Sequence, residues 1–153
     1  MRKKDREITD KTIIYEIINK ALVCRIALAE NNKPYIIPMN FGYKDNCIYL
    51  HTGKIGKKID VLKINPQVCF EIEYDVKLKR TDIDCNWGMK YYSVIGFGKA
   101  HFITNLQEII EALNIIMSHY SEKSFFQYTE KGLENICIIK IVVEEISGKQ
   151  VGH

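Results

Sequence analysis

The stretch HTGKIGKK, in the first half of the chain, contains the residue types that bind a phosphate group. Gly53 and Gly56 allow the backbone to turn sharply and present N–H groups to an anion. Thr52 offers a hydroxyl group, and the adjacent Lys57 and Lys58 supply positive charge. A helix that begins near the lysines would add the partial positive charge of its N-terminus. Taken alone, these residues predict either an anion site or a solvated basic turn.

The spacing of the glycines excludes a nucleotide-binding P-loop. That motif places four residues between its two glycines, and the second glycine is followed by Lys and then by Ser or Thr, whose hydroxyl holds magnesium. Here only two residues separate Gly53 from Gly56, and Lys58 stands where the hydroxyl should be. A phosphate bound at this stretch would therefore be held without magnesium.

The elements that would position this stretch follow from the spacing of the apolar residues. Apolar side chains at helical spacing predict a helix over residues 10–21, with Thr9 or Asp10 as its N-cap. Strands separated by polar turns are then expected at Val23 to Ala29, Pro34 to Tyr43 and Cys47 to His51. The pattern predicts an antiparallel meander with short connections.

After the glycine-rich stretch, one or two helical turns should end at Asn65, because Pro66 disfavours helix in the residue before it. A longer helix is expected from about Leu106 to Tyr120, capped by Thr104 with Gln107 or by Asn105 with Glu108. Further strands are expected at Gln67 to Tyr74, Lys90 to Ile103 and Ile136 to Ile146, with loops over 75–89 and 121–135. About six strands with helices at the start and late in the chain predict an antiparallel barrel rather than a Rossmann domain.

Length and composition fit a single domain over residues 1–153, large enough to bury a core without metals or disulfides. No apolar run is long enough to cross a bilayer, and no signal-peptide core follows the basic N-terminus. We therefore expect a cytoplasmic protein with no membrane partner. The net charge of +3, with acidic and basic residues interspersed, argues against a nucleic-acid partner.

The five cysteines do not have the spacing of a zinc or redox motif, so no metal site is predicted. Four of them lie in apolar runs, where a thiol behaves as a small hydrophobic group. These predicted core residues are Cys24, Cys47, Cys69 and Cys137. Cys85 lies in a polar segment and is the one candidate for an exposed thiol.

Four segments, RKKDREI, PYIIPMNFGY, IYLHTGKIGKKID and YYSVIGFGKA, follow one another along the chain. In this order they resemble the flavin-binding split-barrel proteins of the pyridoxamine 5'-phosphate oxidase-like superfamily, and within it the 5-nitroimidazole-resistance (Nim-like) branch. The resemblance extends from about Arg2 to Lys149. It implies an FMN-binding split antiparallel β-barrel with flanking helices. It also implies a homodimer that binds FMN in two clefts at the subunit interface.

The resemblance assigns roles to particular residues. Those expected along the isoalloxazine ring are Pro38, Met39, Asn40 and Phe41. Those expected at the FMN phosphate are Thr52, Gly53, Lys57 and Lys58, of which Lys58 fits the family's phosphate lysine best. Trp87 to Ser93 would come from the partner subunit and close the site, with Trp87, Tyr91 and Ser93 as contacts. Core or dimer packing is the alternative for these aromatic residues, and Tyr91 and Tyr92 cannot both line one site because neighbouring strand residues face opposite sides.

His51 ends a strand directly before the phosphate stretch, so it should lie at the mouth of a flavin site as a catalytic proton donor. An exposed strand-end residue is the alternative. The resemblance implies an FMN-dependent oxidoreductase, nitroreductase-like, that reduces small aromatic or nitro substrates. The ending VEEISGKQVGH lacks the Arg, Leu and Pro of vitamin B6 oxidases, so that activity is not expected. A flavin carrier without turnover, and a haem-binding or haem-degrading relative on the same fold, remain as alternatives.

Overall fold

The computed structural model describes residues 4–153. Arg2 and Lys3, which begin the first of the four resembling segments, lie outside these residues. The strands are β1 (Glu7–Ile8), β2 (Cys24–Glu30), β3 (Lys33–Met39), β4 (Phe41–Lys44), β5 (Cys47–Gly53), β6 (Gln67–Lys79), β7 (Gly88–Ile103) and β8 (Ile136–Val151). The helices are α1 (Lys11–Lys20), α2 (Lys57–Ile64), α3 (Leu106–Tyr120) and α4 (Glu130–Glu134), with short 3-10 turns η1 (Lys4–Arg6) and η2 (Asp84–Asn86).

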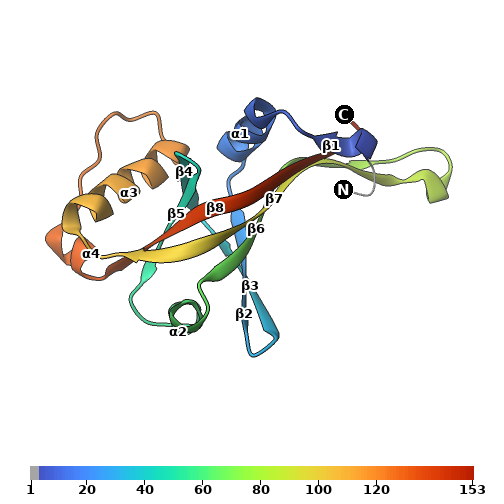
Figure 1. Ribbon diagram of the computed structural model, residues 1–153. Coiled ribbons are helices and arrows are strands. Elements are labelled where there is room, and N and C mark those ends of the chain that lie inside the picture. Colours follow the sequence, from blue (N-terminus) through green and yellow to red (C-terminus); the bar gives the residue numbers. More distant parts are fainter. Residues whose placement is uncertain (1–3) are drawn as a thin grey trace.

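All neighbouring strands are antiparallel, in the order β3-β2-β6-β7-β8-β5-β4, and β1 pairs with β8. β3 and β4 occupy the two edges of this sheet, yet only Asn40 separates them along the chain. The sheet must therefore curl until its edges approach each other (Figure 1). The result is the split antiparallel barrel with flanking helices that the sequence predicts.

The prediction of one strand from Pro34 to Tyr43 within a meander is wrong. The segment is two strands, β3 and β4, broken at Asn40, and each pairs with a different neighbour, β2 and β5. Alternation of apolar residues continues across the break, so the local pattern contains no sign of it. The break allows the chain to pass from one edge of the sheet to the other.

The inner face of the barrel forms the main hydrophobic core. Ile26 on β2, Phe70 on β6 and Ile141 on β8 are each at most 2 % exposed. As predicted, Cys24 and Cys47 are buried and Cys85 is exposed, whereas Cys69 and Cys137 are only half-buried. No helix among residues 4–153 is long and apolar enough to cross a membrane.

Two helices begin where the sequence predicts. The Asp10 side chain accepts a hydrogen bond from the Thr12 N–H, at 2.8 Å, and caps α1. Of the two predicted caps of α3, Asn105 is the one used, because its side chain accepts from the Glu108 N–H at 3.1 Å.

α3 packs over β4 and β5, and Gly42 on β4 makes this possible. A Cβ atom at Gly42 would lie 2.7 Å from the backbone oxygen of Ile115.

β6 and β7 are longer than predicted and extend beyond the barrel as a two-stranded arm, seen at the right of Figure 1. Residues 75–89 are predicted to be a loop, but those up to Lys79 and from Gly88 onwards continue the two strands, so that only residues 80–87 connect them. The register shifts between Tyr74 and Lys77, where Asp75 has a φ of 54°. This bulge and the exposure of both faces of the arm remove the alternation on which a strand prediction depends.

The end of the chain also differs from the prediction. β8 continues past Ile146 to Val151, because its pairing with β7 begins at Ile138 and extends to Val151, which is in register with Tyr91. The expected loop at 121–135 contains the short helix α4, whose N-cap Thr129 accepts a hydrogen bond from the Gly132 N–H. The extension of β8 depends on a partner strand distant in the sequence, and α4 is little more than one helical turn. Neither feature produces a strong local pattern.

Candidate functional site

The connection between β5 and α2 has the backbone that an anion site requires. Gly56, the N-cap residue of α2, has a φ of 136°, a region that favours glycine. Its carbonyl accepts from the N–H groups of Ile59 and Asp60 at 2.9 and 3.2 Å. The N–H groups of Lys57 and Lys58 precede this first bonded turn, so they have no acceptor within the helix. No side chain of the described residues caps Gly56, which leaves this end of α2 available to a ligand.

Two predicted phosphate residues are brought into direct contact. The Lys58 ammonium donates to the Thr52 hydroxyl at 3.0 Å, and both side chains are half-buried. Lys57 turns towards β3 instead, where its Nζ lies 4.5 Å from the centre of the Tyr35 ring, a cation–π contact. Gly53 is exposed, and a Cβ atom there would meet nothing within 4 Å. The folded loop thus gathers the hydroxyl, the cations and the free N–H groups that the sequence placed within eight residues of each other.

His51 is exposed on β5, in register with Ile138 of β8. Thr52 follows it in the same strand and is in register with Cys137, so the two side chains leave opposite faces of the sheet. The structure therefore does not place His51 on the same face as the Thr52–Lys58 pair. β5 ends at Gly53, which has no side chain. At this end of the strand nothing from β5 separates one face of the sheet from the other.

The residues predicted to lie along a flavin ring have different environments. Pro38 and Asn40 are exposed, whereas Met39 is half-buried against the barrel core. Phe41 is fully buried, and its N–H donates to the Tyr120 hydroxyl at 2.9 Å. Its side chain and its N–H are therefore already engaged within this chain. Of the four, Pro38 and Asn40 are the ones with exposed surface for a ligand.

The predicted partner-subunit residues lie on the arm. Tyr91 and Ser93 line one cavity of about 420 Å³ on the outer face of the sheet, together with Met89. Tyr92, between them, faces the other side and stacks on His153 with ring centres 3.8 Å apart. The alternation inferred for Tyr91 and Tyr92 is confirmed.

Trp87 lies nearer the tip of the arm, where its indole N–H donates to the Thr81 carbonyl at 2.9 Å. The arm and α2 lie well apart in Figure 1, the arm at the right and α2 below the barrel. Trp87 therefore cannot reach the β5–α2 loop of its own chain. The wall of the cavity that Tyr91 lines is charged, because Glu71, Glu73 and Lys149 also line it. Arg25 pairs with Glu71 at 3.2 Å and with Glu73 at 2.9 Å. Burial raises the pKa of the Glu71 carboxyl above its usual range, Glu73 adds to this shift, and Arg25 opposes it.

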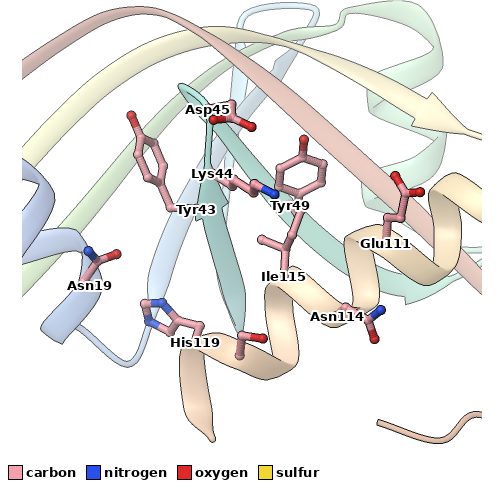
Figure 2. A pocket seen from close by; sticks show the side chains of 10 residues that line it. Asn19, Tyr43, Lys44, Asp45, Tyr49, Glu111, Asn114, Ile115 and His119 are labelled. Carbon is pink, nitrogen blue, oxygen red and sulfur yellow. The ribbon is translucent and has the colours of Figure 1, made fainter. Parts of the chain in front are cut away.

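A larger cavity, of about 610 Å³, lies between α1, the β4–β5 hairpin and α3 (Figure 2). Most of the residues that line it have polar side chains, among them Tyr43, Tyr49, Glu111 and His119, and none of the predicted site residues lines it. His119 lies 2.7 Å from the Ala21 carbonyl through Nε2, so its ring is tied to the end of α1. Sequence reasoning missed this cavity, because its walls come from three elements that no local pattern connects.

The described residues contain no group of three His, Cys, Asp or Glu side chains that could hold a metal ion. The loop between β5 and α2 remains the place where charge, hydroxyl and free backbone donors converge.

The pyridoxamine 5'-phosphate oxidase family model matches residues 10–150, a range that includes the β5–α2 loop and the whole of the arm formed by β6 and β7. The chain belongs to the pyridoxamine 5'-phosphate oxidase family. A solved structure of a candidate 5-nitroimidazole antibiotic resistance protein from Bacteroides thetaiotaomicron is 35 % identical, with a TM-score of 0.84. The alignment covers 94 % of this chain and 86 % of that one. No curated protein matches the chain.

Two more distant members of the fold have similar TM-scores. The flavocytochrome Anf3 from Azotobacter vinelandii is 17 % identical with a TM-score of 0.86, over all of this chain and 72 % of that one. The FAD and haem binding protein from Mycobacterium smegmatis is 13 % identical with a TM-score of 0.86, over 97 % and 74 % of the two chains. These likenesses establish the flavin-binding split-barrel fold for this member of the pyridoxamine 5'-phosphate oxidase family.

Proposed function

We propose that this chain binds FMN at the β5–α2 loop and acts as an oxidoreductase towards small aromatic or nitro compounds. The contact between Lys58 and Thr52, beside the glycine-capped start of α2, carries this proposal. A phosphomonoester dianion needs cations and oriented donors together, and the loop supplies both. The name of the 35 % identical protein from Bacteroides thetaiotaomicron supports nitro compounds as the substrate class.

In this proposal each part of the loop has one task. Lys58 neutralises the phosphate charge, Thr52 orients Lys58, and the free N–H groups of Lys57 and Lys58 donate to phosphate oxygens. Pro38 and Asn40, exposed at the end of β3, would lie against the flat ring. When bound, a flavin supplies the electron transfer, and the protein supplies position and electrostatics. His51 is proposed to give the proton that a reduced nitro group must take up.

We further propose that the site is completed by a second copy of the chain. Ile95, Phe97 and Val142 are 44 %, 50 % and 39 % exposed on the outer face of β7 and β8, an unusual concentration of large apolar side chains. Trp87, Tyr91 and Ser93 would cover the ring from that copy, since the arm lies away from the loop of its own chain. Aromatic side chains suit this task because a flavin ring is itself flat and aromatic.

Titrating the flavin-free protein with FMN and with riboflavin tests the phosphate assignment. Charge-assisted hydrogen bonds contribute about 1.5–3 kcal/mol, so Lys58→Ala should weaken FMN at least about tenfold. Riboflavin has no phosphate and should bind the variant and the wild type equally. Lys123→Ala, a change at an exposed lysine in the α3–α4 loop, is the matched control and should alter neither affinity. Unchanged FMN affinity in Lys58→Ala would contradict the assignment.

The absorbance of the purified protein distinguishes the remaining functions. Flavin bands support the oxidoreductase and the carrier, whereas a Soret band supports a haem protein. Anaerobic mixing of the reduced protein with a 5-nitroimidazole then separates the first two, because a carrier would not be reoxidised on the time scale of turnover. Reoxidation only by oxygen would count against the nitro substrate.

A further inference from the structure

A separate cavity of about 380 Å³ lies where α2, the end of β7, the start of β8, α3 and α4 meet. We call it the α2–α4 cavity. Its volume is within the range of roughly 300–1,000 Å³ that small-molecule sites occupy. None of the residues predicted to bind FMN lines it. It is therefore distinct from the β5–α2 phosphate loop, although Lys54 of that loop contributes to its wall.

Most of the wall of the α2–α4 cavity is apolar. The apolar side chains that line it are Ile59, Phe102, Ile103, Ile109, Leu133 and Ile136. They come from α2, β7, α3, α4 and β8, so the cavity is formed only when these elements pack together. An aromatic ring or a short hydrocarbon chain would bury apolar surface against these side chains, at about 25 cal/mol per Å² of surface removed from water.

The polar part of the wall is positively charged. Lys54 and Lys63 both line the cavity, and Lys63 lies one helical turn after the buried Ile59, on the same face of α2. Thr104 adds a hydroxyl, and no Asp or Glu is among the described lining residues. Neither lysine forms an ion pair with another described residue.

Cys137 lines the α2–α4 cavity together with Lys54 and Lys63. Burial raises the pKa of the Cys137 thiol, and the charges of Lys54 and Lys63 oppose the shift. The positive charges of both lysines are therefore felt at Cys137, on the same wall of the cavity. A ligand group bound there would meet two positive charges and no negative one.

We propose that the α2–α4 cavity binds a small apolar carboxylate. The aromatic or aliphatic body packs among the apolar side chains, and the carboxylate lies against Lys54, Lys63 and the Thr104 hydroxyl. A neutral ligand of the same shape would leave the two lysines without a partner. A larger dianion such as FMN has its own loop, where Thr52 and Lys58 converge.

Fluorine NMR with 4-fluorophenylacetate and its neutral analogue, 4-fluorophenylacetamide, tests the proposal on the purified full-length protein. Each probe is titrated with and without an excess of FMN. The acid should bind at least about fivefold more tightly than the amide, since each charge contact at a partly exposed site is worth up to a few-fold in affinity. FMN should not displace it. Absent binding, equal binding of acid and amide, or displacement by FMN would each overturn the proposal.

Paired variants locate the probe. The double variant Lys54→Gln and Lys63→Gln should weaken the acid at least about fivefold and leave the amide unchanged. The double variant Lys33→Gln and Lys123→Gln removes two exposed lysines elsewhere and is the matched control. All four substitutions are at exposed side chains, and thermal melts verify that both variants fold. Equal weakening in both pairs would mean that the probe responds to net charge alone, which would refute the site.

Discussion

His51 and Thr52 are adjacent in the sequence, but their side chains leave opposite faces of β5. The sheet therefore lies between the proposed proton donor, His51, and the proposed phosphate site at Thr52. Because β5 ends at Gly53, which has no side chain, a planar ring lying across the strand end could contact both faces. His51 can therefore act on a bound flavin only if the flavin ring lies across this strand end. Substitution of His51 tests this position of the ring.

We expect His51→Ala to retain the fold and most of the FMN affinity, yet to slow anaerobic reoxidation of the reduced flavin by a 5-nitroimidazole about tenfold or more. The physical reason is that nitro reduction takes up protons, and histidine is the side chain that gives a proton most readily near neutral pH. Stopped-flow absorbance measures the rate.

His101→Ala, at an exposed histidine on β7, is the matched control and should reoxidise like the wild type. If His51→Ala has the wild-type rate between about pH 5 and pH 8, His51 is only an exposed strand-end residue.

At the scale of elements, α3 is held against the barrel by a close approach to β4. The approach depends on Gly42, and Phe41 beside it donates its N–H to Tyr120 near the end of α3. The His119 ring also packs on Phe41, with ring centres 4.4 Å apart. This contact region couples α3 to the residue that follows the β3–β4 break, so it also positions Asn40 and the exposed end of β3.

We expect Gly42→Ala to destabilise the protein by about 1–3 kcal/mol, because the added methyl would collide with the backbone of α3 rather than with a side chain that could move. For a chain of this size the midpoint of thermal unfolding should fall by roughly 2–4 °C per kcal/mol. Circular dichroism melts measure the shift.

Gly88→Ala is the control at another strand position, where a Cβ atom would meet nothing within 4 Å. It should change the stability by no more than about 0.5 kcal/mol. Equal stability of the Gly42 and Gly88 variants would mean that α3 does not need the close approach.

At the scale of the whole molecule, the apolar outer face and the projecting arm have the same explanation in the proposed dimer. A second copy would cover Phe97 and its neighbours and would bring its own arm to the phosphate loop. One interface would then both bury apolar surface and complete the flavin site. Dimerisation and flavin binding should therefore be lost together.

We expect the wild type to scatter light as a dimer and Phe97→Asp to scatter as a monomer with much weaker FMN binding. The reason is that a buried, unpaired carboxylate at an apolar interface is strongly unfavourable. Phe125→Asp, at a phenylalanine that is 71 % exposed in the loop after α3, is the matched control and should remain dimeric. A monomeric wild type that binds FMN tightly would rule out the shared site.

Local patterns in the sequence were enough to predict several parts of this protein. Helical periodicity and capping residues placed α1 and α3 to within about a residue, because these features depend on neighbours three or four positions away. The cluster of residues in the proposed phosphate loop also followed from the sequence, since a tight turn between a strand and a helix keeps Thr52, Gly56 and Lys58 together.

The tertiary structure decided what depends on distant partners. The order of the strands, the break at Asn40 and the extension of β8 to Val151 arise from pairing between segments far apart in the chain. The same holds for the α2–α4 cavity, whose walls come from five elements. A local pattern shows which face of a strand is apolar, but it does not specify which strand lies beside it. For this reason the position of the β5–α2 turn could be predicted from the sequence, whereas the orientation of His51 relative to Thr52 and the α2–α4 cavity required the folded chain.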